Sequence, residues 1–398
     1  METMKKTAII NVHVFDGHRG LDDLSTVTIS GPLIVDVSPY NPENTLSPDI
    51  DIIDGAGCTL LPGLIDSHVH VDKPEQLDDL ASAGVTTALD MASFPHSLTM
   101  AIRDASLATA PDGSPRPAFL TAGLFATAPG SMHSKLVGGL PAACLSSPEE
   151  ARNFVAKRVE EGSDYIKVVT DIPGPSQDVL DALVAAARTS GKKTVAHAAT
   201  YEPFRMAVES GADLVTHVPI DRPVDAAWAE ALAEEDRTCC PTLIMMKGIC
   251  QARNAGPPAG EGHLPRPDEQ ASESKPKREL SICHSNDSVR ALVKAGVRIL
   301  AGTDAHITPF APVKHGRSMH QELHLMYAAS MGPLEILRSA TSVPAKYWGL
   351  QGKGVVEPNA TADLLLVEGQ PLEDITDIGN VKSVWISGKK VAKTTGSQ

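Results

Sequence analysis

The chain has 398 residues, of which 42% are apolar and 21% are charged. This composition is typical of a folded globular protein and excludes a collagen-like, fibrous or wholly disordered one. The 35 Lys and Arg residues against 49 Asp and Glu residues give a net charge of −14. Such a charge disfavours binding to nucleic acid or to an anionic membrane surface. No apolar run reaches the roughly 18 residues that a membrane-spanning helix needs, so we expect neither nucleic acid nor a membrane as a partner.

The six cysteines form no CxxC pair and no regular spacing, so we do not expect a disulfide framework. Reduced thiols indicate a cytoplasmic protein. Cys239 and Cys240 are adjacent within an apolar run, where small buried thiols are the expected interpretation.

Both ends of the chain are rich in β-like segments. Short alternating pieces separated by turn residues occupy roughly residues 5–61, and the same texture returns after residue 350. Neither end is long enough to bury much of a core by itself. We therefore predict one small β-sandwich domain built from residues 1–61 and 356–398.

Eight short apolar runs alternate with helical stretches between these ends. The runs predict strands that are buried on both faces, and the helices between them predict parallel β/α units. The runs occupy residues 64–70, 84–91, 117–125, 165–170, 193–198, 214–219, 238–246 and 298–304. Helices with clear stop signals are predicted at 148–161, 177–190 and 201–210. Eight units predict an α/β protein with a (β/α)8 TIM barrel over residues 62–355, and an open doubly wound sheet is the alternative.

Residues 251–281 are rich in Pro, Gly, Glu and Lys and lack apolar periodicity. They directly follow the seventh predicted strand. We expect a loop over the mouth of the barrel, with disorder as the alternative.

Metal-competent side chains stand where several predicted strands end, which is the edge at which barrel enzymes place their active sites. His68 and His70 end the first strand, and alternate residues of a strand point to the same side, so both can face one ion. The remaining members of this set are Lys167, His197, His217 and Asp304. Imidazole and carboxylate ligands suit zinc. A hydrogen-bonded place in the core is the alternative for any single histidine, but four at the strand ends of one barrel favour a catalytic metal site.

A second pair of histidines is more simply explained as part of a helix than as a metal site. His320 and His324 lie four residues apart in the sequence HQELH, but Glu322 is not where a helix-borne zinc protease motif needs its Glu. We interpret this segment as a helix that follows the eighth strand.

Several segments match known motifs. They read LPGLIDSHVH at 61–70, AGVTTALDM at 83–91, AGTD at 301–304, ATSVPAKYWGL at 340–350, ADL at 362–364 and VWISGK at 384–389. Together they resemble the amidohydrolase superfamily of metal-dependent hydrolases, and the resemblance covers nearly the whole chain. The segment SDYIKVV at 163–169 is similar to the fourth-strand motif of the prolidase-like and imidazolonepropionase-like subgroup, whose members use two metal ions.

The resemblance implies a binuclear centre, which we expect to hold zinc. The family pattern assigns the first ion to His68, His70 and Asp304, the second ion to His197 and His217, and a bridging carbamate to Lys167. An ammonium cannot ligate a metal, and burial at a strand end favours the neutral amine that reacts with CO₂. Relatives with a single ion lack this lysine, and one ion is the alternative here.

The same resemblance implies an enzyme that acts on a small-molecule substrate. We expect a metal-bound hydroxide to cleave a C–N bond in an amide, peptide-like or cyclic amide substrate. Asp304 would accept the proton of the water and pass it to the leaving nitrogen. The alternatives on the same centre are an ester or lactone hydrolase, a deaminase or a decarboxylase, and a catalytically inactive scaffold of the same fold. A homo-oligomer is compatible with the sequence.

Substrate contacts are less well marked. The sequence GSMH at 130–133 follows the third strand, where related enzymes often carry a Gly-Gly-His turn. This position makes His133 the predicted substrate-binding residue, with a solvated loop histidine as the alternative. Asp171 and His306 also closely follow barrel strands, and we interpret both as structural.

Overall fold

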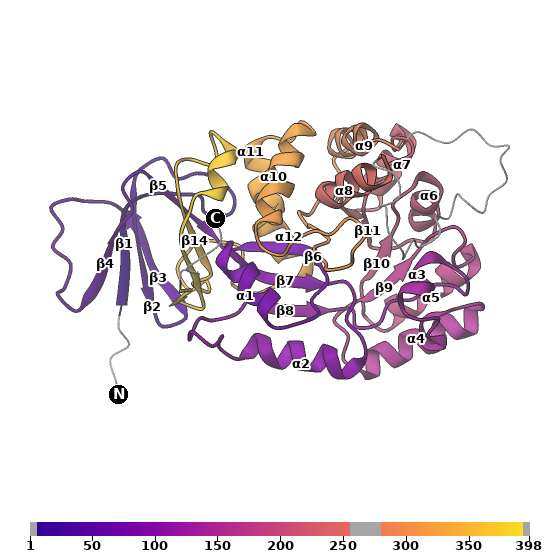
Figure 1. Ribbon diagram of the computed structural model, residues 1–398. Coiled ribbons are helices and arrows are strands. Elements are labelled where there is room, and N and C mark those ends of the chain that lie inside the picture. Colours follow the sequence, from indigo (N-terminus) through magenta and orange to yellow (C-terminus); the bar gives the residue numbers. More distant parts are fainter. Residues whose placement is uncertain (1–5, 255–279, 393–398) are drawn as a thin grey trace.

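The computed structural model describes residues 6–254 and 280–392. Figure 1 shows a β-rich part on the left and, beside it, a larger part in which helices surround parallel strands. The predicted metal-competent side chains all belong to the larger part. The β-rich part combines segments from both ends of the chain.

The strands of the β-rich part are β1 (Lys6–Val14), β2 (Ser25–Ser30), β3 (Leu33–Pro39), β4 (Ile50–Asp54), β5 (Cys58–Pro62), β14 (Leu364–Glu368), β15 (Val381–Ile386) and β16 (Lys389–Lys390). They are hydrogen-bonded in the order β16-β15-β14-β5-β1-β2-β3, and β4 also pairs with β1. The first half of β1 pairs with β2 and β4, and its last two residues pair with β5. Because β1 pairs with β2, β4 and β5, the eight strands form one additional sheet.

One apolar cluster holds this sheet together. Alternate residues of β2 are buried, as expected for a strand with one face on a core. Val27 and Ile29 from this strand share a cluster with Leu60 of β5 and with Leu366 and Trp385 near the other end of the chain. The two chain ends therefore bury their apolar faces against each other.

The larger part contains all eight predicted strands. They are β6 (Leu64–Val69), β7 (Val85–Asp90), β8 (Ala118–Thr121), β9 (Ile166–Val169), β10 (Thr194–His197), β11 (Leu214–Thr216), β12 (Thr238–Cys240) and β13 (Arg298–Ile299). Every pairing is parallel, in one sheet of β6 to β8 and another of β9 to β13. Single parallel bridges, Val69 to Ala305 and Ala126 to Val168, connect the two sheets. The protein thus has a TIM-barrel-like α/β fold with an additional sheet.

Helices cover these strands from outside (Figure 1). The larger ones are α1 (Glu75–Ser82), α2 (His96–Leu107), α4 (Pro148–Glu160), α5 (Gln177–Thr189), α6 (Tyr201–Glu209), α7 (Ala226–Glu234), α8 (Leu243–Asn254), α9 (Ile282–Ala295) and α10 (Ser318–Ala328). Shorter elements are α3 (Met132–Leu136), η1 (Pro141–Ala143), α11 (Pro333–Ser339), α12 (Ser342–Trp348) and η2 (Ile375–Gly379). The three helices predicted with stop signals are α4, α5 and α6, and their bounds agree with the prediction within one residue.

Local chemistry explains where α4 begins. The hydroxyl of Ser147 accepts a hydrogen bond from the backbone N–H of Glu150, and Pro148 occupies the first turn. Both features are preferred at helix N-termini, because the first N–H groups of a helix have no partner inside it.

The seventh predicted strand is shorter than expected. The apolar run 238–246 contains β12, which ends at Cys240, and then the start of α8 at Leu243. The buried Glu322 carboxylate of α10 accepts hydrogen bonds from the backbone N–H groups of Leu243 and Ile244, at 2.9 and 2.7 Å. These acceptors satisfy N–H groups of the first helical turn, which have no partner inside the helix. The first four residues of the predicted loop 251–281 belong to α8, so the loop prediction is wrong there, and residues 255–279 lie outside the described residues.

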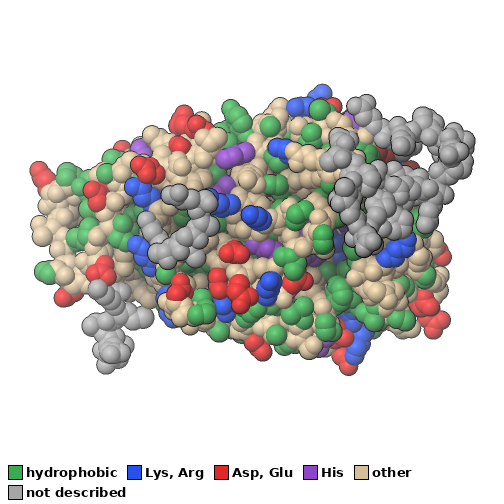
Figure 2. Space-filling view, viewed as in Figure 1, with side chains coloured by type: hydrophobic (Ala, Val, Ile, Leu, Met, Phe, Trp, Pro, Cys, Tyr) green, Lys and Arg blue, Asp and Glu red, His purple; other side chains and the backbone are tan. Residues whose placement is uncertain are grey.

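The surface shows no broad basic patch on the face drawn in Figure 2, where Lys and Arg side chains lie among Asp and Glu. Within the described ranges, no helix is both long enough and apolar enough to cross a membrane.

His320 has a structural role. It lies on α10, is 7% exposed, and its Nε2 is 2.8 Å from the carbonyl oxygen of Ala83, at the end of α1. Burial lowers the pKa of His320 to about 4. Between pH 6.5 and pH 4 the unfolded chain therefore binds a proton that the folded protein does not bind, so stability falls as the pH falls.

We expect the His320→Gln variant to lose less stability on acidification than the wild type, because it lacks this titration. The linkage amounts to about 3 kcal/mol when fully developed. Urea unfolding at pH 7 and at pH 4.5 measures the difference. His96→Gln, at an exposed position on α2, is the control and should keep the wild-type difference. An equal loss in both variants would contradict the prediction.

Candidate metal centre

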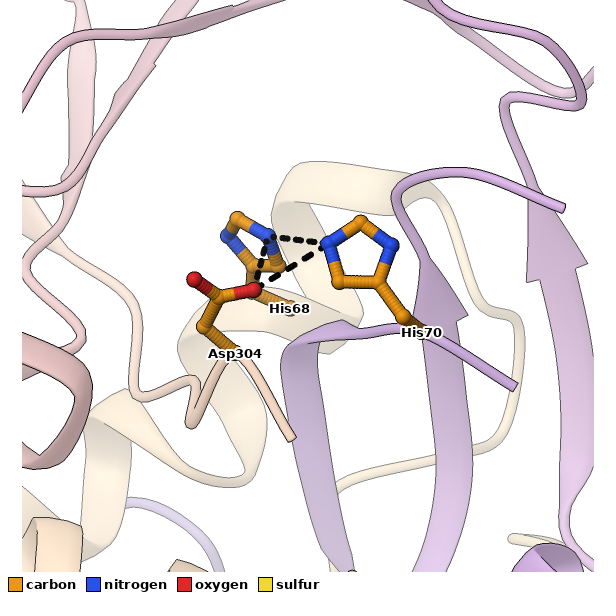
Figure 3. Close-up of side chains that lie close together, drawn as sticks. All are labelled: His68, His70 and Asp304. Carbon is orange, nitrogen blue, oxygen red and sulfur yellow. Dashed lines mark hydrogen bonds and ion pairs between the residues drawn. The ribbon is translucent and has the colours of Figure 1, made fainter. Parts of the chain in front are cut away.

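Three side chains from two strand ends meet at one point. His68 and His70 project from β6 and the residue after it, and Asp304 follows β13. Figure 3 shows both imidazoles directed at the Asp304 carboxylate. His68 Nε2 and His70 Nε2 each lie 3.1 Å from Asp304 Oδ1 and 3.4 Å from each other. The three atoms therefore form a compact triangle.

This triangle has the dimensions of a metal site. Donors about 2.0–2.1 Å from a tetrahedral zinc ion are roughly 3.4 Å from one another. Without a cation, the two Nε2 atoms can share only one proton in a long N–H···N contact, and both face the same carboxylate oxygen. A cation between the three donors would engage all three lone pairs at once, so the donor set fits a divalent metal ion.

His197 and His217 lie beside this triangle. His197 Nδ1 is 2.7 Å from His217 Nε2, and His217 Nε2 is 3.9 Å from Asp304 Oδ2. The ring centroid of His217 lies 5.1 Å from that of His68 and 4.3 Å from that of His197. The structure thus brings together all four histidines that the sequence singled out.

The second group of metal-competent side chains adds residues to those expected. His133, Asp171 and His197 offer ligand atoms that all lie within 4.8 Å of one another. His133 lies on the short helix α3, not in an open loop, and its Nδ1 contacts Asp171 Oδ2. His197 Nε2 is 3.6 Å from Asp171 Oδ1. Asp171, interpreted from sequence as structural, therefore lies in contact with His133 and close to His197.

Lys167 lies on β9 with its side chain inside the fold and is 3% exposed. Its Nζ has no hydrogen-bond partner within the described part of the chain. Burial lowers the pKa of Lys167 to about 8, and the charge of Asp304 opposes this shift. Burying an amine without a hydrogen-bond partner costs free energy. The Nζ atom of Lys167 is therefore suited to a reaction that supplies a partner.

Burial also keeps the imidazoles neutral, which is the form that binds metals. It lowers the pKa of His68 to about 3, that of His197 to about 4 and that of His217 well below its usual range. Burial would lower the pKa of His70 too, but its contact with Asp304 raises it above the ordinary value. Although burial opposes the shift, the nearby imidazoles, His68 first, hold the pKa of Asp304 well below its usual range.

Hydroxyl groups orient two of the rings. Thr216 Oγ1 is 2.6 Å from His68 Nδ1, and Thr242 Oγ1 is 2.6 Å from His217 Nδ1. With Nδ1 held in this way, Nε2 of each ring is directed at the centre. The sequence reasoning missed both threonines, although each stands at or near a strand end.

The backbone is in an uncommon conformation at the centre. His217 has φ 72° and Asp304 has φ 57°, in the left-handed region that residues other than glycine rarely adopt. Such conformations cost about 1–3 kcal/mol each and persist where surrounding contacts enforce them, often at functional sites.

His306 supports the Asp304 loop and offers no ligand atom to the centre. Its Nδ1 lies 2.7 Å from the carbonyl oxygen of Asp304, and the side chain is buried. This geometry agrees with the structural interpretation made from the sequence.

An α/β fold of parallel strands, with imidazoles and carboxylates gathered at the strand ends, defines a class of metal-binding proteins. Residues 59–391 match the amidohydrolase family, and the chain belongs to this family. Members of the family generally use a divalent metal ion and act on small molecules.

Individual relatives are distant. Adenine deaminase of Bacillus subtilis (strain 168) is 23% identical over 379 residues, which cover 92% of this chain and 54% of the deaminase, so the chain spans about half the length of this relative. Dihydroorotase of Streptococcus thermophilus (strain CNRZ 1066) is 34% identical over 94 residues, which cover 21% of each protein. The crystal structure of a Xaa-Pro dipeptidase with bound methionine has a TM-score of 0.80 at 23% identity, covering 97% of this chain and 99% of that chain. At that identity the likeness shows the fold alone.

A buried carboxylate connects the two strand ends that form the triangle. Asp66 Oδ1 accepts hydrogen bonds from the backbone N–H groups of His68 and Thr303, at 3.2 and 3.0 Å, and Oδ2 accepts one from Thr303 Oγ1 at 2.8 Å. Burial raises the pKa of Asp66 to about 7. Asp66 therefore holds His68 and the residue before Asp304 in a common frame.

We expect Asp66→Ala to destabilise the metal-free protein by about 3 kcal/mol, because it leaves buried donors without acceptors. Asp66→Asn keeps Oδ1 for the two N–H groups and can donate to the Thr303 hydroxyl, so its cost should stay within about 1 kcal/mol. Urea unfolding measures both. An equal loss of unfolding free energy in the two variants would contradict the view that the hydrogen bonds of Asp66 stabilise the protein.

Proposed function

We propose that this protein is a metal-dependent hydrolase that cleaves a C–N bond in an amide, peptide-like or cyclic amide small molecule. The observation that carries the proposal is the triangle of His68 Nε2, His70 Nε2 and Asp304 Oδ1, with donor separations of 3.1–3.4 Å. Its place at the ends of parallel strands is where enzymes of this architecture act. Membership of the amidohydrolase family supports the same reaction class.

The proposed cofactor is zinc, with two ions favoured over one. His68, His70 and Asp304 would hold the first ion, and His197 and His217 the second, with Lys167 bridging them as a carbamate. The unpartnered Nζ of Lys167 supports this role, because carbamate formation would replace an isolated amine with an anion that the ions neutralise. Bound divalent ions supply Lewis acidity, which lowers the pKa of water and polarises a carbonyl oxygen.

The chain's own residues would handle the protons. Asp304 Oδ1 lies 3.1 Å from two imidazole nitrogens, whereas Oδ2 is 3.9 Å from His217 Nε2, so we assign the role of proton acceptor to Oδ2. Asp304 would then return this proton to the leaving nitrogen, as general acid. The Nε2 of His133, whose Nδ1 contacts Asp171, would contact the substrate.

We also infer that the two parallel sheets form one closed (β/α)8 barrel. The bridges from Val69 to Ala305 and from Ala126 to Val168 support closure at both seams. The first proposed domain is the barrel, built from the described residues between 62 and 355. The second is a small β-sandwich built from the described residues of 1–61 and 356–398. These two chain ends share one apolar cluster. All six cysteines are free, which supports a cytoplasmic location.

A deaminase is the second candidate. The similarity to adenine deaminase extends over 92% of this chain, which favours this reaction over the ester, lactone and decarboxylation alternatives. Release of ammonia from adenine separates the deaminase from an amide hydrolase, and a scaffold without catalysis would retain well under one zinc per chain after mild dialysis.

Asp304→Asn tests the function. The wild type should hydrolyse at least one member of a panel of N-acyl amino acids, dipeptides, cyclic imides and lactones. Because the variant lacks the proton acceptor, we expect kcat to fall about 100-fold or more, together with a loss of bound zinc. Asp287→Asn removes an exposed carboxylate from α9 and should match the wild type. Survival of both zinc content and turnover in Asp304→Asn would refute the assignment.

Lys167→Met tests the bridge. Met has a similar length and no charge, so the free energy of unfolding of the metal-free variant should stay within about 1 kcal/mol of the wild type or exceed it. We expect zinc to fall from two equivalents per chain to one or fewer. A ¹³C NMR carbamate signal from ¹³C-bicarbonate should appear in the wild type only. Two retained zinc ions in the variant would rule out the bridging role.

A further inference from the structure

Asp171 lies two residues after the end of β9 and faces two histidines at once. Its side chain is 20% exposed. Oδ2 contacts Nδ1 of His133, and Oδ1 is 3.6 Å from Nε2 of His197. The carboxylate therefore stands between the predicted substrate contact and a proposed metal ligand.

The orientation of His197 gives this contact its meaning. Its Nδ1 is 2.7 Å from His217 Nε2, on the side of the centre, while its Nε2 faces Asp171. If Asp171 accepts the Nε2–H proton, the lone pair of the neutral ring is on Nδ1, which is the nitrogen that faces the centre. Carboxylates that hold the second nitrogen of a ligand histidine fix its tautomer and increase its basicity.

The same argument applies to His133. Its Nδ1–H is donated to Asp171, so Nε2 is the nitrogen left to interact with a substrate. The ring packs edge-on against Phe125 and His197, with centroid distances of 6.1 and 4.6 Å, and its side chain is 16% exposed. The ring of His133 is thus held by packing, and one carboxylate faces a nitrogen of both rings.

We propose that Asp171 is a positioning residue that couples the metal centre to the substrate contact, by fixing the tautomers and orientations of His197 and His133 together. This inference rests on the proposed function. It assigns to Asp171 a role that the metal ligands alone do not supply. Removal of the Asp171 carboxylate should weaken zinc binding by His197. It should also allow both neutral tautomers of His133.

Zinc affinity, measured by competition with a chromophoric chelator, tests the link to His197. We expect Asp171→Asn and Asp171→Ala to bind zinc 10- to 100-fold more weakly than the wild type. Asp164→Asn is the matched control at the other end of β9, where the carboxylate accepts hydrogen bonds from Thr121 N and Arg103 Nη2. Its zinc affinity should stay within threefold of the wild type. His133→Ala should also retain wild-type affinity, and a loss there would mean that His133 is itself a ligand and overturn the assignment.

¹⁵N NMR of the imidazoles in the metal-free protein tests the link to His133. The wild type should show His133 protonated at Nδ1, and Asp171→Asn should show a mixture of tautomers. An unchanged tautomer together with unchanged zinc affinity would reduce Asp171 to a structural residue and overturn the proposal.

A substrate from the panel adds a third measurement. Asp171→Asn should lower kcat by at least tenfold with a smaller change in KM, because the rings remain present but lose their fixed orientation. Failure of the function itself gives a different pattern. A wild type that retains less than one zinc per chain refutes the metal centre, whereas the metal-free NMR experiment still decides whether Asp171 sets the His133 tautomer.

Discussion

The convergence of three donor atoms, His68 Nε2, His70 Nε2 and Asp304 Oδ1, at 3.1–3.4 Å is the constraint on which the site depends. Without a cation, the two imidazoles share one long Nε2···Nε2 contact and the same carboxylate oxygen. The fold nevertheless enforces this arrangement. Strand alternation places the two histidines on one side of β6, and the parallel bridge from Val69 to Ala305 brings the Asp304 loop to the same strand end.

Polar groups in the next layer maintain this geometry. Asp66 holds the backbone of His68 and Thr303, while Thr216 and Thr242 orient the rings of His68 and His217. The left-handed backbone at His217 and Asp304 persists within the same network. The chain thus supports an uncommon local conformation with ordinary hydrogen bonds, which is the usual basis of a pre-organised site.

The seventh strand shows where pattern reading failed. The run 238–246 is apolar throughout, and periodicity cannot separate a buried strand from a buried helix start. In the structure the buried Glu322 side chain accepts the first free N–H groups of α8, a contact from a distant part of the chain that the local pattern does not contain. The contact between His133 and Asp171 is equally invisible in the local sequence pattern. These two residues are 38 residues apart in the chain, and the segment after β8, which bridges to β9 through Ala126 and Val168, leads to the helix that carries His133.

Local periodicity and residue type at strand ends were enough to predict the eight strands, three of the helices, and the four histidines and Asp304 that lie together, but not α8 or the contacts of Asp171. The tertiary structure alone decided which ring nitrogen of each histidine faces the centre, which hydroxyls and carboxylates hold the others, and how Asp171 reaches two of them. These features depend on the relative positions of separate strands and loops, and such distances have no counterpart in the local pattern of a chain.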